Sequence, residues 1–392
     1  MTIMKFTHTM NTARGFSVVE LMVAMAVGLL AMTFATRMLV GAEQNKASSL
    51  GGSDQMQNGM LALFSIQEDA VQAGWGLNDE LLAGCNTTFT DTSGFELAVD
   101  ASSGANRTPL APVIIQNSTT GSDAVSLYAG TSQTGVGSVK VRSLYAGADT
   151  LDIDTQAPFG FAAGDAIVVA TEPSGGNCTL AQLSADPLAS SLQFSSGDGN
   201  RFNSGALGGN AYAAGQARVF NLGPARNLAL HTWTAANGVL TLRASNLEGA
   251  TAAGVAVVSN IVALKAQYGF DTRASAVFDA ATSMQVLQWS NTMVDADGVG
   301  GIGNAGDYRR VAAIRVAIVA RSAAPEKPDS AGACTATTTA PVVFATASPS
   351  GVTAVPVTAP VALANDPFDW KCYRYRVFES IIPIRNSGWR PT

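Results

Sequence analysis

One long block of apolar residues stands out near the start of the chain. Residues 16–36 are almost entirely apolar, with Glu20 as the one charged side chain among them and Arg37 directly after them. The block is close to the roughly 20 residues that a helix needs to cross a bilayer. The polar segment before it carries Lys5 and Arg14 and no acid. A basic start before an apolar run is typical of membrane-targeting segments, which keep positive charge on the cytoplasmic side.

After this block, the apolar positions follow a helical period. They recur at spacings of three, four and seven, and we interpret them as the face that docks onto the globular part: Met56, Met60, Leu63, Phe64, Ala70 and Val71. Gly51, Gly52 and Gly59 lie in the same segment, so we expect a kink or a break there. We expect the helix to end by residues 74–76, Gly-Trp-Gly.

The rest of the chain shows the pattern of β-strands joined by long loops. Apolar alternation, β-branched residues and bounding Gly, Asn, Asp and Pro clusters predict strands at residues 124–128, 151–153, 166–170, 217–220, 239–243, 261–270, 311–319 and 373–378. Residues 323–366 are rich in Ala, Thr, Pro and Val and poor in charge. We interpret them as a long surface loop between the last two strands.

Composition narrows the function. The 392 residues are 47% apolar and only 13% charged, against about 25% charged in an average protein. This excludes a disordered polyelectrolyte and a coiled-coil rod. The net charge of −6, with a pI near 5.0, disfavours nucleic acid as a partner, because phosphate binding relies on clustered Lys and Arg.

Histidine is nearly absent, which restricts catalytic chemistry. His8 and His231 are the two histidines, so a Ser-His-Asp or Cys-His arrangement would have to use His231. It stands in an alternating segment, residues 228–233, that we interpret as a strand with the histidine on one face.

The cysteines indicate disulfides. The four cysteines include no C-x-x-C pair, which disfavours a tetrahedral zinc site. An even number of scattered cysteines fits an oxidising compartment. Four cysteines allow three connectivities; we pair Cys85 with Cys178 and Cys334 with Cys372, the second pair linking the charge-poor loop to the last strand.

Three interpretations of the N-terminus compete. A secretory signal peptide would be cut after the apolar run, with residues 40–42 as its small-residue site, but its apolar region should span about 7–15 residues. A plain transmembrane anchor has the right length, but a carboxylate inside it is costly, by about 2.5–3.5 kcal/mol at the helix centre. The third interpretation accounts for Glu20.

Residues 14–21, RGFSVVEL, resemble the type IV prepilin motif. The resemblance implies that a prepilin peptidase cuts after Gly15 and that the new N-terminal residue, Phe16, is N-methylated. It also implies that Glu20, the fifth residue after the cut, neutralises the N-terminal amine of a neighbouring subunit in the pilus core. A buried carboxylate needs such a partner, and an α-ammonium group supplies it.

A second resemblance covers the C-terminal part. Residues 262–271, 308–322 and 375–386 are similar to motifs of the PilW family of minor pilins, in the same order and with the same closing Arg-Asn pair. Residues 67–75, with Cys85 soon after them, are similar to the segment at which the helix ends in that family.

One further segment could carry chemistry. Residues 298–303 match G-x-G-x-x-G, but no βαβ unit surrounds them and the nearby acids would repel a pyrophosphate. Asp295, Asp297 and Asp307, with Asn304, could instead supply oxygen ligands to calcium on a glycine-bent loop. The other interpretation is an ordinary Asp/Gly hairpin loop.

We therefore predict an α+β fold, with a long N-terminal pilin-type helix on a large antiparallel β-rich head with long loops. Its expected parts are a cleaved leader at 1–15, a transmembrane or pilus-core helix at 16–40, an amphipathic continuation at 41–75 and the head at 76–392. The resemblances imply a non-enzymatic minor pilin of the type IV pilus, anchored in the inner membrane with a periplasmic head and later carried in the extracellular pilus.

The implied partners are other minor pilins, the major pilin, a PilY-type tip adhesin, the inner-membrane platform protein and the prepilin peptidase. No cofactor is expected except the calcium considered above. Two other classes remain open. One is a minor pseudopilin of a type II secretion system, which shares the prepilin motif. The other is a membrane-anchored hydrolase, which would depend on His231.

Overall fold

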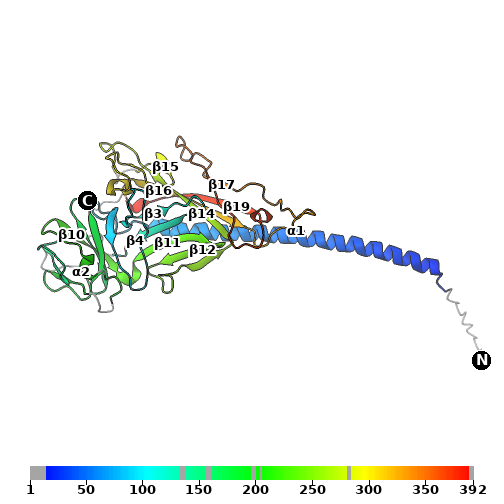
Figure 1. Cartoon of the computed structure of the whole chain (residues 1–392), viewed down its shortest axis with the longest axis horizontal. Coiled ribbons are helices and arrows are strands. Elements are labelled where there is room, and N and C mark those ends of the chain that lie inside the picture. Colours follow the sequence, from blue (N-terminus) through cyan, green and yellow to red (C-terminus); the bar gives the residue numbers. More distant parts are fainter. Residues whose placement is uncertain are drawn as a thin grey trace, which may run out of the picture. The chain divides into compact units, whose positions relative to one another are not determined.

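The chain divides into two compact units, residues 1–53 and residues 54–392. Figure 1 shows its computed structural model, which describes residues 15–132, 138–154, 160–195, 200–203, 205–279 and 284–387. The first unit is helical, and the second is a β-rich head, so the predicted α+β class is confirmed. The predicted leader lies almost wholly outside the described residues.

Helix α1 spans Val18–Gln72 and belongs to both units. It runs through Gly51, Gly52 and Gly59 as continuous helix, so the break expected at these glycines is wrong. A helical glycine costs only about 1 kcal/mol relative to alanine, which a helix of 55 residues tolerates. The helix ends where expected: Gly74 follows with a φ of +86° and its N–H donates to the Tyr128 carbonyl at 2.8 Å.

The head is built on three larger sheets. A six-stranded sheet has the order β2-β1-β8-β7-β10-β5 and a five-stranded sheet has the order β13-β12-β11-β4-β3. Their strands are β1 Cys85–Thr88, β2 Pro109–Leu110, β3 Val113–Gln116, β4 Ala124–Ala129, β5 Ser138–Lys140, β7 Asp165–Thr171, β8 Asn177–Gln182, β10 Ala217–Pro224, β11 Ala229–Ala236, β12 Val239–Ala244 and β13 Val255–Ser259. All their pairings are antiparallel except β1 with β8.

The third sheet, of order β15-β14-β16-β19, is wholly antiparallel and lies against the helix. Its strands are β14 Ile261–Phe270, β15 Gln288–Ser290, β16 Val311–Arg321 and β19 Tyr375–Pro383. The remaining elements are two small pairs and short turns, namely β6 Thr150–Asp152 with β9 Ser191–Gln193, β17 Val342–Val343 with β18 Val357–Thr358, α2 Gly205–Gly208, α3 Ala305–Tyr308, η1 Ala225–Asn227, η2 Trp370–Cys372 and η3 Arg385–Ser387.

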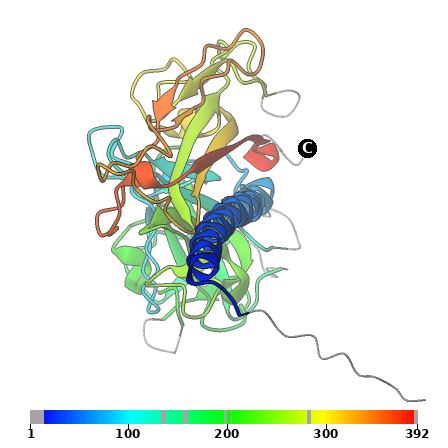
Figure 2. The same ribbon diagram turned by 90° about the vertical axis from the view of Figure 1, so that its right-hand side faces the viewer.

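Both faces of the third sheet are covered, which explains why β14 is buried along its whole length. On one face, Ala62 and Ile66 of α1 share an apolar cluster with Ile314 and other residues of β16. Figure 2 shows β19, in red, beside the light-blue end of α1. On the other face, residues of the segment expected to be a surface loop, among them Phe344, pack on the sheet. Part of that segment therefore covers the core instead of lying in solvent.

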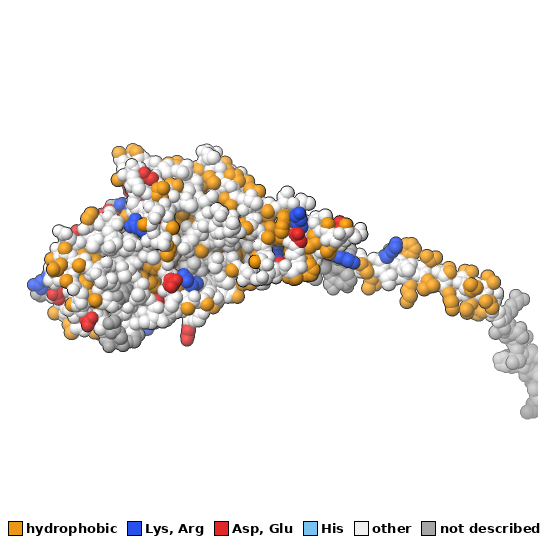
Figure 3. Space-filling view, in the orientation of Figure 1, with side chains coloured by type: hydrophobic (Ala, Val, Ile, Leu, Met, Phe, Trp, Pro, Cys, Tyr) orange, Lys and Arg blue, Asp and Glu red, His pale blue; other side chains and the backbone are white. Residues whose placement is uncertain are grey.

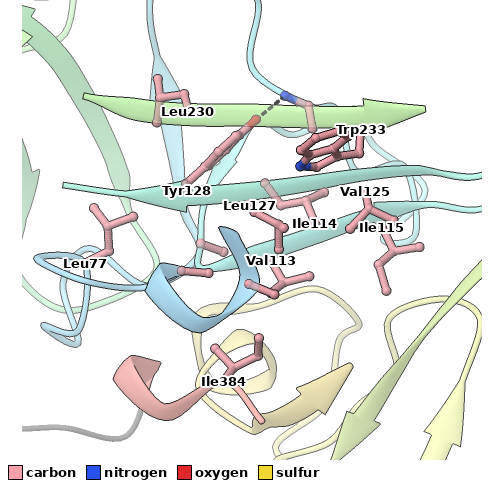
Figure 4. Packing of buried hydrophobic residues seen from close by; sticks show 14 of the residues in the cluster. Leu77, Val113, Ile114, Ile115, Val125, Leu127, Tyr128, Leu230, Trp233 and Ile384 are labelled. Carbon is pink, nitrogen blue, oxygen red and sulfur yellow. Dashed lines mark hydrogen bonds between the residues drawn. The ribbon is translucent and has the colours of Figure 1, made fainter. Parts of the chain in front are cut away.

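The main apolar core joins the helix, the five-stranded sheet and the C-terminal sheet in one cluster. Figure 4 shows part of this cluster, including Ile114 of β3, Leu127 of β4 and Leu230 of β11. Tyr128 is fully buried, and its hydroxyl accepts the Ala98 N–H at 2.7 Å. A second cluster lies on the six-stranded sheet and contains Ile167, Val169 and Val219 among others.

Candidate functional site

A polar cap opens the apolar helix. The Oγ of Ser17 accepts the Val19 N–H at 3.3 Å, and the Oε2 of Glu20 accepts the Ser17 N–H at 3.2 Å. The Ser side chain thus caps an amide of the first turn, which lacks an intrahelical partner, and the Glu side chain reaches back to the Ser amide. Phe16 precedes the cap and is 84% exposed. The cap therefore holds the Glu20 carboxylate near the residue predicted to become the N-terminus.

The helix that follows is apolar on all sides. Val18–Ala42 has a mean hydropathy of 2.2 and none of its most apolar window is buried. At 1.5 Å per residue it is long enough for a hydrocarbon layer of about 30 Å. The hydroxyls of Thr33 and Thr36 donate to the helix carbonyls of Leu30 and Met32 at 2.8 and 2.9 Å, which satisfies both hydroxyls on the apolar surface that Figure 3 shows in orange.

Within the head, residues 54–72 of α1 bury a face on which three of the five residues are Gly or Ala. This face comprises Gln55, Gly59, Ala62, Ile66 and Ala70. A Cβ on Gly59 would lie 2.0 Å from Cε2 of the Phe378 ring on β19, so glycine is what lets the helix and the sheet approach so closely.

The docking face predicted from the larger apolar residues is therefore largely wrong. Met56, Met60, Phe64 and Val71 lie outside the buried face and are 42–58% exposed. Of the predicted stripe, only Ala70 is buried and Leu63 partly buried. Small residues occupy this face because they let the helix backbone approach the sheet closely. Close approach gives dispersion contacts along the docked part of the helix. We call Met56, Met60, Phe64 and Val71 the outer stripe.

Asn386, the second residue of the closing Arg-Asn pair, caps the C-terminal end of this helix. The Nδ2 of Asn386 donates to the carbonyls of Val71, Gln72 and Ala73 at 3.3, 3.2 and 3.1 Å. These are carbonyls that the end of a helix leaves without intrahelical partners. Asn386 therefore fastens the C-terminal end of the chain to the end of α1. Its place in the sequence motif gave no hint of this capping role.

Charged residues of the predicted C-terminal motifs are buried in the head. The Lys265 Nζ on β14 contacts Asp123 Oδ1 at 2.5 Å and donates to the Ser118 carbonyl at 2.6 Å, which joins the third sheet to the loop before β4. The Arg315 guanidinium lies between the rings of Trp289 and Phe344, at 4.7 and 4.6 Å from their centroids. Burial lowers the pKa of Arg315 to about 10. These residues stabilise the sheet and do not face solvent as a reactive site would.

His231 lies on β11, as predicted, and it joins the helix to the five-stranded sheet. Its Nδ1 lies 2.8 Å from the Asp69 carboxylate of α1, and its Nε2 lies 2.8 Å from Asn246 Oδ1. Trp233 Nε1 donates to the same Asp69 oxygen at 2.7 Å. Burial lowers the pKa of His231, but Asp69 and Asn246 more than offset this and raise it above its ordinary value of 6.5. Both ring nitrogens are engaged by a carboxylate and an amide, not by a nucleophile.

Two disulfides stabilise the head, and they join the pairs chosen from the sequence. Cys85 of β1 is bonded to Cys178 of the adjacent strand β8, with a Cα–Cα distance of 5.9 Å. Cys334 is bonded to Cys372 in η2, with a Cα–Cα distance of 4.8 Å, and so ties the long segment to the start of β19.

The three carboxylates of the Asp/Gly segment do converge. One oxygen from each of Asp295, Asp297 and Asp307 lies within 4.8 Å of the others. The buried Asp307 carboxylate, however, already accepts four backbone N–H groups, of Ala296, Asp297, Gly303 and Asn304, at 2.6–3.3 Å. Burial raises the pKa of Asp307 although these bonds favour its charged form. The convergence of the carboxylates is compatible with calcium binding, while the four hydrogen bonds are compatible with a loop stabilised by Asp307 alone. The calcium site stays a prediction.

The fold and the N-terminal segment define a class: a pilin-like protein with a capped apolar helix ahead of a β-rich head. Two family models match the chain. The prokaryotic N-terminal methylation motif covers residues 10–36, and the type IV pilus-assembly protein W model covers residues 231–386. The matches over residues 231–386 and 10–36 thus support a type IV pilin-like minor pilin similar to the PilW family. No curated protein and no solved structure matches it.

The two matches coincide with the features that the geometry singles out. The first includes Gly15, Phe16 and Glu20. The second runs from His231 to Asn386, the two residues that hold the end of α1 to the sheet and to the C-terminal end of the chain. Asp69, the partner of His231 on the helix, was not predicted, because nothing in the sequence around it distinguishes it from a solvated carboxylate.

Proposed function

We propose that the chain is made as a prepilin, cut after Gly15 and methylated on Phe16. The apolar helix then holds it in the inner membrane with its head in the periplasm until it is incorporated in, or primes, the pilus. It acts by packing and display, not by catalytic turnover. The observation that carries this proposal is the Glu20 carboxylate, which stands at the start of a helix that is otherwise built for an apolar surrounding.

The chemistry of Glu20 supports a role in assembly. In the single chain its carboxylate accepts one N–H, at 3.2 Å, which is far from satisfying an ion in a low-dielectric core. The α-ammonium of a neighbouring subunit offers both an opposite charge and further donors. Breaking a buried ion pair by removal of one partner costs about 3–5 kcal/mol, enough to stop a subunit from being taken up.

The outer stripe supports a second contact with neighbours. Its four large side chains follow one another at spacings of four, four and seven residues, which places them along one side of the helix. They are exposed on a helix whose other face is docked. A neighbouring pilin helix is the partner that such an apolar ridge fits, because helices pack by fitting ridges into grooves.

The proposed partners follow from this route. They are the prepilin peptidase and the inner-membrane platform protein before assembly, and other minor pilins, the major pilin and a PilY-type tip adhesin within the pilus. Among the rival classes, the type II pseudopilin shares the N-terminal motif alone, and the PilW match over residues 231–386 favours the pilus. A hydrolase is disfavoured by the engaged ring nitrogens of His231.

Replacement of Glu20 by Ala tests the proposal. We expect the variant to be cut and inserted in the membrane like the wild type, because neither step needs the ion pair, but to be missing from pili sheared off the cells. Glu248→Ala, which removes an exposed carboxylate from a head loop, is the matched control and should be recovered normally. Wild-type amounts of the Glu20→Ala chain in sheared pili would refute the assembly role.

A further inference from the structure

A polar groove lies in the head where α1 ends, and its lining is suited to a ligand. The groove measures ≈ 690 Å³ and is lined by the end of α1, by β4, by β11 and by Asn386. This is within the size range of small-molecule sites, about 300–1,000 Å³. Trp75, directly after the helix, lines it with a side chain that is 49% exposed. A large exposed indole beside a groove is a flat apolar surface with an N–H on its edge.

Polar groups with unused hydrogen-bonding capacity line the same groove as this indole. Asp69 receives His231 and Trp233 on Oδ2, while its Oδ1 has no partner within the described chain. The Nδ2 of Asn246 and the whole side-chain amide of Asn227 are likewise without partners among the described residues, and both asparagines line the groove. Planar amides and carboxylates of this kind offer paired donors and acceptors at fixed angles.

The electrostatics of the groove disfavour a charged ligand. Its described lining has no lysine or arginine, so an anion would find no cationic partner there. The single carboxylate, Asp69, is already balanced by His231, whose pKa it raises, and by the Trp233 N–H. A cation would therefore compete with two donors that are already in place.

We propose that this groove binds a neutral sugar chain. A pyranose ring has an apolar C–H face that stacks on an indole such as Trp75, and a rim of hydroxyls that both donate and accept. Asn227, Asn246 and Asp69 line the same groove as the indole and offer donors and acceptors to such a rim. An aliphatic ligand would leave these groups buried without partners, which is costly. This inference goes beyond the assembly role and does not depend on it.

Isothermal titration of the full-length protein tests the inference, in a detergent without a sugar headgroup. The probes are chitotetraose and maltotetraose as neutral chains and tetragalacturonate as an anionic chain of equal length. We expect at least one neutral chain to bind, and to bind about tenfold or more tightly than tetragalacturonate. Absence of binding for both neutral chains at millimolar concentration, or equal binding of the anionic chain, would overturn the inference.

Variants locate the binding. Trp75→Ala should weaken it by about tenfold or more, as removal of a central aromatic anchor does, and Asn227→Ala should weaken it without touching the helix. Phe368→Ala removes an aromatic side chain of similar exposure, 46%, away from the groove and should bind as the wild type does. Melting curves of all three should match the wild type. Unchanged affinity in both groove variants would show that the sugar binds elsewhere and overturn the assignment.

Discussion

At the scale of single residues, a few side chains fix where the helix lies, and their roles depend on partners far away in the sequence. His231 forms a hydrogen bond with Asp69, Asn386 donates to the last carbonyls of α1, and Gly59 packs against the Phe378 ring. None of these partners is within 160 residues of its counterpart. The sequence predicted that His231 lies on a strand and that Asn386 belongs to a motif. It did not predict their contacts, because spacing along the chain carries no information about contacts between distant segments.

The Asp69–His231 pair predicts a pH dependence. The pKa of His231 is raised in the folded chain, so the pair contributes stability that is fully present below the unfolded pKa of about 6.5 and is lost as the pH rises through the folded pKa. His231→Gln should therefore be less stable than the wild type by about 1–2 kcal/mol at low pH, and by less at high pH. Chemical denaturation of both proteins across this range measures the difference. A gap that is constant with pH, or that widens as the pH rises, would contradict the assignment.

The three converging carboxylates give a second prediction at this scale. If Asp295, Asp297 and Asp307 hold calcium, millimolar calcium should raise the Tm, and magnesium should do so much less because it demands tighter geometry. Asp295→Asn with Asp297→Asn should remove this difference. Asp307→Asn should lower the stability by about 1–3 kcal/mol even in chelator, because it disturbs four backbone hydrogen bonds. Identical melting curves in calcium and in chelator would leave the segment an ordinary Asp/Gly loop.

At the scale of elements, the sequence was most informative where the local pattern is strong. The apolar block became the start of α1, and the segments predicted as strands lie in β4, β6, β7, β10, β12, β14, β16 and β19. Each has the alternation or the continuous apolar run of its kind. Short strands such as β2 and β5 were not predicted, because two or three residues hold no periodicity and are fixed by their neighbours in the sheet.

The face of the helix was misjudged for a physical reason. Size and hydrophobicity favour Met and Phe as core residues, but the docked face of this helix holds Ala62, Ile66 and Ala70, and the Met and Phe side chains lie outside it. Likewise the charge-poor segment 323–366 looks like a surface loop by composition, although Val343, Phe344 and Val361 cover the third sheet. Composition alone cannot separate a solvated loop from a lid.

The tight approach at Gly59 can be tested with a matched pair of substitutions. Gly59→Ala should destabilise the head, because its Cβ would overlap the Phe378 ring and overpacking costs about 1–3 kcal/mol. Gly52→Ala, on the same helix with no atom within 4 Å of the added Cβ, should gain the higher helix propensity of alanine instead. Thermal unfolding of the full chain compares them. Equal shifts of Tm in the two variants would show that Gly59 has no packing role.

At the scale of the whole molecule, the apolar part of α1 and the head differ in the surfaces that they expose. The described part of the apolar span is uncharged apart from Glu20 and Arg37, whereas the head holds the two disulfides and the three larger sheets. The middle of the chain, with the six-stranded sheet and its one parallel pair, could not be predicted as a topology, because strand order depends on contacts between distant segments. The sequence did predict the apolar helix, the β-rich class and the resemblance to PilW that the family model matches over residues 231–386.

The mass of the N-terminal peptide, measured on chain recovered from sheared pili, tests the central claim most directly. We predict that the chain is present there and begins at Phe16 carrying one methyl group. Loss of Lys5 and Arg14 with the leader changes the formal net charge from −6 to −8. A chain that begins at Glu43 would establish a cleaved signal peptide, and a chain that still begins at Met1 would show that the anchor is never processed. Either result would contradict assembly as a minor pilin.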